Sequence, residues 1–555
     1  MAYERSHIKV ELHIDNKGIF YTINKNASKM NTGKISLQQI RNILDRDWEV
    51  TSSPRIHKTL AAIFFIIFFS HNPVEGRGKA PQVVNRNSFP QDFLFGVGTS
   101  ALQIEGSAHE GGRGPSVWDS IFMSEKATTI KDIDKCGTMI DHYKRYSEDV
   151  KLLKKLGINS YRFSIAWSRI FPDGTLEGGI NQEGIDFYNK LIDELLANGI
   201  TPFVTILHFD YPLSLFTKGG FLNPSIIKHF KDYSDVLFKA YGDRVKHWTT
   251  FNELEITAIF NYMHGFDIPI PENCQITKEC RDVYTLMHIC LLSHGESVKL
   301  YREKYQAKQG GEIGIVLSIE DYIPFSRKPE DVAATVRLRD FSTGWILDPL
   351  FNGDYPTSMK ELVRDRLPKF TEEEKRLIKG SLDFIGINYY RSFFGKDEPN
   401  KFLIKGLDNY DSLAIKQVFN DEGIILGIRD NATMSFVNPQ GLYNVLVFLK
   451  KTYNNPKIYI TENGIASGTI SQPLKDKHRM DYIATHINYV KRALDAGVNV
   501  KGFFVWSAFD TFEFHQGFSD KWGLIYIDFA DNLKRVPKQS ARWYRWFLTG
   551  NRNFV

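Results

Sequence analysis

Two short hydrophobic segments of this chain each end in a glutamate. Glu462 follows Ile458-Tyr459-Ile460-Thr461 and is followed at once by Asn463-Gly464, and Glu253 comes directly after 248–252. β-Branched and aromatic residues favour a strand, and Asn-Gly ends one. We therefore expect each carboxylate to lie rigidly at the C-terminal end of a buried strand. Two carboxylates held in this way indicate a paired-carboxylate active site.

The elements that must position these glutamates form a repeating series. From residue 89 onward, short apolar segments alternate with longer helical patterns, and eight of them read as strands: 93–97, 160–165, 202–207, 247–251, 313–317, 384–388, 458–461 and 500–506. This alternation predicts an α/β fold in which residues 89–550 form a single (β/α)8 TIM barrel with long βα-loop insertions. In such a barrel the loops after the strands build the active site.

Polar side chains are concentrated where these strands end. Carboxylates, amides, arginine, histidine and tryptophan can bind sugar hydroxyls and stack on a sugar ring. The strand-end residues are Gln103, Glu105, Arg162, His208, Asp210, Asn252, Glu253, Asn388, Tyr390, Glu462, Trp506, Asp510 and Glu513. Their chemistry indicates a carbohydrate site.

Several of these residues stand in recognisable motifs. They are Thr250-Phe251-Asn252-Glu253, Thr461-Glu462-Asn463-Gly464, Tyr161-Arg162-Phe163-Ser164-Ile165, Gln103-Ile104-Glu105-Gly106 and Asn388-Tyr389-Tyr390. With these motifs, residues 88–550 resemble glycoside hydrolase family 1, and most of all its plant β-glucosidases.

The resemblance implies a retaining mechanism without a cofactor, in which Glu253 is the acid/base and Glu462 the nucleophile. In retaining enzymes the two carboxyl groups lie roughly 5–5.5 Å apart. If Arg162 and Tyr390 reach Glu462, they favour its ionised form, whereas Glu253 faces a carboxylate and should hold its proton more tightly. Asn388 is expected to support the pair.

The resemblance also assigns the residues that bind substrate. Those implied for the sugar are Gln103, His208, Asn252, Tyr390, Trp506, Glu513 and Phe514, and those implied for the aglycone are Phe260, Met434, His515 and Trp522. The chain departs from the family pattern around them. Leu254 stands where a proline usually follows the acid/base, Glu255 adds a second acid nearby, and Phe209 and Phe514 replace the commoner tryptophans.

Composition narrows the possible partners of the protein. The 555 residues carry a net charge of only +5 and no long basic tract, so nucleic acid is not expected as a partner. No His/Cys cluster has zinc spacing, so we expect no metal. Cys274 and Cys280 are close enough in sequence for a short disulfide, whereas Cys136 and Cys290 are expected to be buried free thiols.

Residues 1–88 differ from the rest and are expected to lie outside the mature fold. The apolar run 60–69 is too short to span a bilayer but suits a signal-peptide core, although its internal position is unusual. Either the start is wrongly assigned, and Met30 or an unseen exon boundary lies nearer the true beginning, or the extension is genuine and disordered. We expect the secretory pathway, the extracellular space or the vacuole, where the sequon at Asn431 would matter.

These observations predict a retaining β-glucosidase acting on a small plant glycoside. Two alternatives stay open: a transglucosidase, in which an alcohol replaces water, and a catalytically impaired sugar-binding member of the family. The sequence does not predict the oligomeric state or the natural aglycone.

Overall fold

The computed structural model describes residues 84–258, 281–400, 410–429, 436–467, 472–551 and 553–554, and the backbone of four strands near the N-terminus. The chain divides into two compact units, Met1–Gln82 and Val83–Val555. In the first unit, β1 (Ala2–Tyr3), β2 (Ile8–Asp15), β3 (Gly18–Lys25) and β4 (Lys29–Lys34) form an antiparallel sheet in sequential order. The apolar run 60–69 lies outside the described residues.

The second unit is built on a closed barrel of eight parallel strands, which confirms the predicted (β/α)8 architecture. The strands are β5 (Leu94–Gly98), β6 (Ser160–Ser164), β7 (Thr201–Leu207), β8 (His247–Asn252), β9 (Glu312–Ser318), β11 (Phe384–Asn388), β16 (Ile458–Asn463) and β17 (Val500–Trp506). They follow one another around the barrel in chain order, and β17 closes the circle by pairing with β5. Each strand predicted from the sequence is present, with ends shifted by at most two residues.

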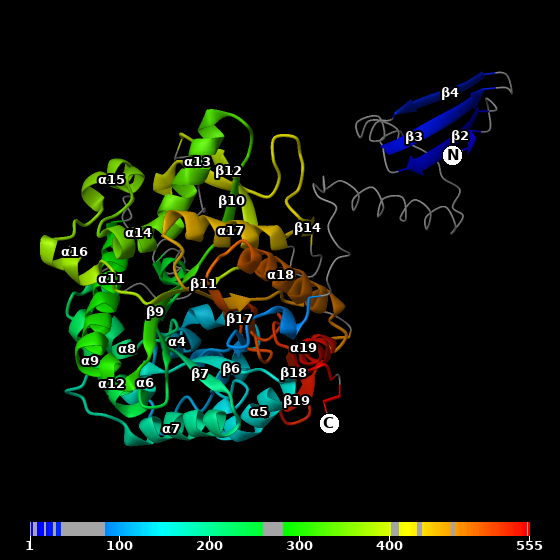
Figure 1. Cartoon of the computed structure of the whole chain (residues 1–555). Helices are drawn as coiled ribbons and strands as arrows, with labels where there is room; N and C mark the ends of the chain where they lie inside the picture. The colour runs from blue at the N-terminus through cyan, green and yellow to red at the C-terminus, as the bar shows by residue number, and fades with distance from the viewer. Residues whose placement is uncertain are drawn as a thin grey trace. The chain divides into compact units, whose positions relative to one another are not determined.

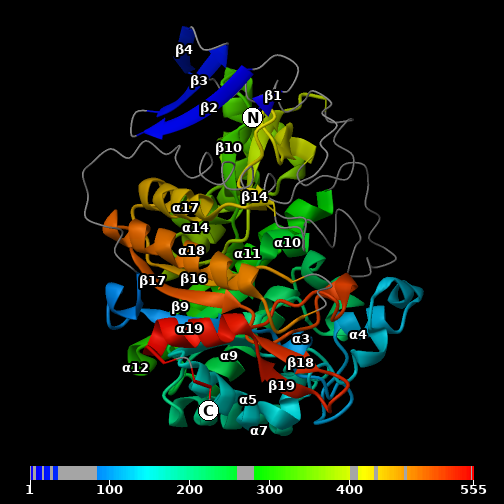
Figure 2. The same cartoon turned by 90° about the vertical axis from the view of Figure 1, so that its right-hand side faces the viewer.

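Helices surround the barrel (Figure 1). The longer ones are α5 (His142–Leu156), α7 (Gln182–Ala197), α9 (Ile226–Tyr241), α11 (Arg281–Tyr301), α17 (Pro439–Thr452), α18 (Lys477–Asp495) and α19 (Gln539–Thr549). In α9 the buried residues Phe230, Tyr233, Leu237 and Tyr241 recur at helical spacing, so one face packs on the barrel. Both Figure 1 and Figure 2 show α17, α18 and α19 side by side.

Aromatic side chains fill the interior of the barrel near the N-terminal ends of the strands. The Phe203 ring contacts those of Phe384, Tyr459 and Phe504, with centroid distances of 5.6, 5.3 and 5.2 Å. These four residues form a buried cluster separate from the main core. Because this end is packed solid, an accessible site can form only at the C-terminal ends of the strands.

The loops at the C-terminal ends carry further structure. β10 (Asp321–Pro324), β12 (Ser392–Asp397) and β13 (Ala414–Gln417) form a small sheet on which α13 (Pro329–Arg339) packs. The pairs β14 (Ile428–Arg429) with β15 (Phe436–Val437), and β18 (Ile525–Asp528) with β19 (Lys534–Pro537), form two hairpin-like ladders. Among the described residues no helix combines the length and apolar character needed to cross a bilayer. Cys136 and Cys290 are buried free thiols, as predicted.

Candidate active site

A cavity of about 430 Å³ opens at the C-terminal end of the barrel, a volume in the range of small-molecule sites. It is lined by both glutamates and by most residues predicted to bind substrate: Gln103, His208, Glu253, Tyr390, Glu462, Trp506, Glu513, Phe514 and Trp522. The structure therefore brings together side chains that lie more than 400 positions apart in the sequence.

Glu462 is held by a buried cation and a phenol. Arg162 Nη1 donates to Glu462 Oε1 over 2.6 Å, and Tyr390 Oη donates to Glu462 Oε2 over 2.6 Å. Burial raises the pKa of this carboxyl, and the charge of Arg162 and the hydrogen bond from Tyr390 act in the opposite direction. Both contacts favour the ionised form, as a nucleophile requires.

Glu253 has a different environment in the same cavity. Its Oε1 accepts a hydrogen bond from Asn388 Nδ2 over 2.8 Å. Burial, followed by repulsion from Glu462, raises the pKa of Glu253 to about 8. A carboxyl group with this pKa carries a proton at neutral pH, as a general acid requires.

Each glutamate lies beside a β-bulge. β8 advances from Thr249 to Asn252 while its partner β9 advances only from Gly314 to Val316. In β16 the residue before Glu462 is likewise unpaired against β11. A bulge redirects the side chain that follows it, and the bulged strand ends aim both glutamates into the cavity.

A hydrogen-bonded network lies directly behind the two glutamates. The amide oxygen of Asn252 accepts from Arg162 Nη2 at 2.6 Å and from Asn388 Nδ2 at 3.1 Å. Its amide nitrogen lies 3.2 Å from His208 Nε2. Asn252, Arg162 and Asn388 are buried and are not among the residues that line the cavity; they contact one another and the lining residues Glu462, His208 and Glu253. This network fixes the relative positions of the two carboxyl groups.

The far wall of the cavity is formed by β17 and the loop after it. The ring of Trp506 stacks against His208 at 5.7 Å, and burial lowers the pKa of His208 well below its ordinary value, so that the imidazole is neutral. Gln103 Nε2 lies 3.3 Å from Glu513 Oε1, which also accepts from Thr511 Oγ1 over 2.5 Å. Burial raises the pKa of Glu513 well above its ordinary value. This wall offers hydrogen-bond donors and acceptors suited to sugar hydroxyls.

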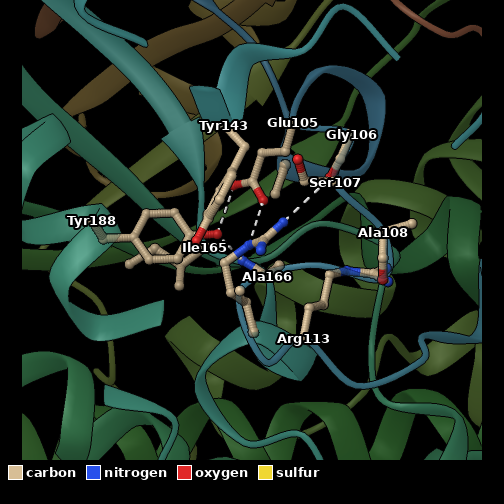
Figure 3. Close-up of polar contacts among 12 residues, drawn as sticks. Glu105, Gly106, Ser107, Ala108, Arg113, Tyr143, Ile165, Ala166 and Tyr188 are labelled. Carbon is tan, nitrogen blue, oxygen red and sulfur yellow. Dashed lines mark hydrogen bonds and ion pairs between the residues drawn. The ribbon is translucent and has the colours of Figure 1, made fainter. Parts of the chain in front are cut away.

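Glu105, another strand-end acid, has a structural role. Arg169 Nε donates to Glu105 Oε2 over 3.0 Å, and Tyr188 Oη donates to Glu105 Oε1 over 2.6 Å. Figure 3 shows Glu105 and Tyr188 pointing toward one another, and Arg169 also lies 4.1 Å from the ring centroid of Tyr143. Glu105 is absent from the lining of the cavity. This buried ion pair anchors the C-terminal end of the short helix α3 (Ala101–Ile104), which carries Gln103.

Asp210 and Asp510 also point away from the cavity. Asp510 Oδ1 accepts from Lys538 Nζ over 2.6 Å in a fully buried ion pair. Asp210 borders a separate buried void of about 20 Å³, and burial raises its pKa to about 7. A strand-end position alone therefore does not place an acid in the site.

The predicted aglycone residues are only partly described. Trp522 lines the cavity and its ring meets that of Tyr390 edge-on at 5.5 Å. His515 is half-buried and is not a lining residue. Phe260, Met434, the pair Cys274 and Cys280, and the sequon at 431–433 lie outside the described residues.

Several residues of the cavity were not predicted from the sequence. They are Trp118, Phe209, Ile256, Ser318, Arg391, Phe436, Val437, Gly464, Ile465, Ala466, Tyr482 and Asp520. Arg391 directly follows the predicted Tyr390, and Gly464 lies two residues after Glu462 in the same motif, so closeness in sequence is a usable signal. Trp118, Phe436 and Asp520 belong to the long insertions that follow barrel strands, and the course of these insertions cannot be read from the strand patterns.

The comparisons with known proteins define the class. The model of glycosyl hydrolase family 1 matches residues 85–553, and the chain therefore belongs to that family. It is 46% identical over 473 residues to the furostanol glycoside 26-O-β-glucosidase of Hellenia speciosa, a match that covers 84% of each chain. It is 43% identical to β-glucosidase 24 of Oryza sativa subsp. japonica, covering 85% of this chain and 95% of the relative.

A solved structure gives the same result. A rice β-glucosidase mutant in covalent complex with Glc superposes with a TM-score of 0.80 at 37% identity, covering 84% of this chain and all of the other. Within its family the protein is a glycoside hydrolase of the β-glucosidase group.

Proposed function

We propose that the protein is a retaining β-glucosidase that hydrolyses small-molecule plant glucosides through a covalent glucosyl-enzyme. The observation that carries this proposal is the unequal environment of two glutamates in one cavity. Burial raises the pKa of both carboxyl groups, but Glu462 has a cation and a phenol that oppose this rise, whereas Glu253 has an amide, and its pKa reaches about 8. Such a pair supplies one nucleophile and one acid.

Each half-reaction uses both residues. In the first, a carboxylate oxygen of Glu462 bonds to the anomeric carbon while the glycosidic C–O bond breaks, and Glu253 gives its proton to the leaving oxygen. The charge of Glu462 is then lost as an ester, so the repulsion that raises the pKa of Glu253 disappears. In the second, Glu253 takes a proton from water, the water oxygen bonds to the anomeric carbon, and Glu462 leaves as a carboxylate.

The side chains around the cavity support an apolar aglycone. Aromatic rings of Trp118, Phe209, Phe436 and Trp522 contribute to the lining. Flat apolar rings favour contact with hydrophobic groups and sugar faces. The relative from Hellenia speciosa carries furostanol glycoside in its name. Plant glucosides with a hydrophobic aglycone are therefore the proposed substrate class.

The test is hydrolysis of a chromogenic β-glucoside, with the first-formed sugar followed by NMR. We expect β-glucose as the initial product, inactivity of Glu462→Gln, and rescue of Glu253→Ala by azide as β-glucosyl azide. α-Glucose as the first product would overturn the retaining mechanism. Binding without turnover would support the impaired sugar-binding alternative, and a dominant alkyl glucoside in the presence of an added alcohol would support the transglucosidase.

A further inference from the structure

A second buried acid, Glu255, lies two residues after Glu253 in the short helix α10 (Leu254–Ile256). Only 3% of the surface of Glu255 is exposed to solvent. One carboxyl oxygen accepts a hydrogen bond from the backbone N–H of Ser318, the last residue of β9. The other oxygen is buried without a hydrogen-bond partner in the described structure. Burying an acid in this way costs free energy, so a compensating role for it is expected.

The turn that carries Glu253 needs support. Glu253 has a φ of +47°, in the left-handed region that non-glycine residues seldom adopt. Such a conformation persists only where its surroundings impose it. The bulge before Asn252 also interrupts the regular ladder with β9 at this point. The proline that usually follows the acid/base in this family would fix the backbone φ angle at position 254. Leu254 has no pyrrolidine ring and does not impose this restraint.

Two contacts replace the missing restraint, and both go to β9. The backbone N–H of Glu253 donates to Val316 O over 2.9 Å. Glu255 then binds the N–H of Ser318, two residues further along the same strand. The turn is thereby attached to β9 at the strained residue and again two residues after it, and Ser318 itself lines the cavity.

We infer that Glu255 is a positioning residue for the acid/base: it holds the strained turn against β9 so that the Glu253 carboxyl meets the leaving-group oxygen. Burial, and then the charge of Glu253, raise the pKa of Glu255 well above its ordinary value, which favours its protonated form. Its Oε1 is the acceptor for the N–H of Ser318. A glutamine has the same acceptor in the same place, whereas a methionine fills the space without one.

The leaving group of the substrate provides the test. A 2,4-dinitrophenyl β-glucoside departs without protonation, whereas a methyl β-glucoside needs the proton of Glu253. In both cases kcat/KM reports the step that forms the glucosyl-enzyme. We expect Glu255→Met to lower kcat/KM for the methyl glucoside at least tenfold and to leave that for the dinitrophenyl glucoside within about twofold of the native value. Glu255→Gln should restore most of the activity toward the methyl glucoside.

Glu312→Met is the matched control. Glu312 lies at the opposite end of the same strand, where it accepts from Tyr459 Oη over 2.7 Å and pairs with Lys457. Its loss removes a partly buried carboxyl contact far from the cavity. Because this contact has no part in positioning Glu253, we expect both substrates to be affected equally.

Equal losses on the two substrates in Glu255→Met, or no loss on either, would overturn the inference. If Glu255→Met yields no folded protein, Glu255→Asp carries the same test, since its side chain is one methylene too short to reach Ser318. The inference rests on the proposed function, but the two fail differently. A native protein that hydrolyses neither glucoside overturns the proposed function, whereas an active protein insensitive to Glu255 overturns only the positioning role.

Discussion

Arg162 and Glu462 form a fully buried ion pair, with 2.6 Å between Arg162 Nη1 and Glu462 Oε1, although 300 residues separate them in the sequence. The guanidinium binds Asn252 at the same time, through Nη2. One side chain of β6 therefore connects the ends of β16 and β8. This contact makes the two glutamates unequal, because it opposes the rise in the pKa of Glu462 that burial causes.

Removing the cation should move the acid limb of the pH profile. Glu462 must be ionised to attack, and without Arg162 its pKa is higher. We expect Arg162→Met to shift the acid limb of kcat/KM to higher pH. Tyr390→Phe, which removes one hydrogen bond but keeps the cation, should shift it less in the same direction. An unchanged acid limb in Arg162→Met would contradict this assignment.

The alkaline limb should report the acid/base. Glu253 has a pKa of about 8 and must be protonated to assist departure of the aglycone. For an alkyl or phenyl glucoside, kcat/KM should therefore fall as the pH rises through about 8. With a dinitrophenyl glucoside the same limb should be absent or weak. A limb of equal strength for both substrates would assign it to another group.

The raised pKa of Glu253 also predicts an effect on stability. Between the ordinary carboxyl pKa of the unfolded chain and about 8, the folded protein binds one more proton at Glu253. Stability is thus lost as the pH rises through this range. Glu253→Gln cannot ionise, so we expect it to be more stable than the native protein at pH 8, by up to about 4 kcal/mol for a pKa raised from 4.5 to about 8.

Near pH 4.5 the difference should vanish, because the native carboxyl is then protonated in the folded protein. Urea unfolding at pH 8 and at pH 4.5 measures the difference in the free energy of unfolding between Glu253→Gln and the native protein at each pH. Glu330→Gln, at an exposed position in the first turn of α13, serves as the control and should change neither. Equal effects of Glu253→Gln at both pH values would contradict the raised pKa.

Arg169 should matter for folding more than for chemistry. Its partner Glu105 is buried, and removal of one member of a buried pair leaves an unpaired charge. We expect Arg169→Met to lower the free energy of unfolding by about 3–5 kcal/mol. The measurement is urea denaturation at neutral pH. In the fraction that remains folded, the pH dependence of kcat/KM should be unchanged, which separates this pair from that of Arg162.

The barrel was predictable because each of its strands is a local pattern. The segment Ile458–Thr461, for example, is β-branched or aromatic throughout and ends at Asn463-Gly464, so neighbouring residues alone indicate the strand and its end. Glu253 and Glu462 were predicted for the same reason, and the resemblance to a known family supplied their roles. Arg162 and Tyr390 also reach Glu462, as expected.

Other features of the site were not predictable in this way. Glu105 and Asp510 stand at strand ends as Glu253 does, yet they pair with Arg169 and Lys538 away from the cavity. The contact of Glu255 with Ser318 depends on a bulge in β8, and no local sequence pattern predicts that bulge. Such outcomes depend on pairing register and on partners distant in sequence.

The amino-acid sequence by itself determined the type and order of the strands and helices and the presence of two strand-end glutamates, because these follow from interactions between neighbouring residues. Only the tertiary structure decided which acids share a cavity and how the environments of the two glutamates differ. Closure of the barrel brings Arg162 to Glu462 and leaves Glu253 with Asn388, and this difference in partners makes the two carboxyl groups unequal.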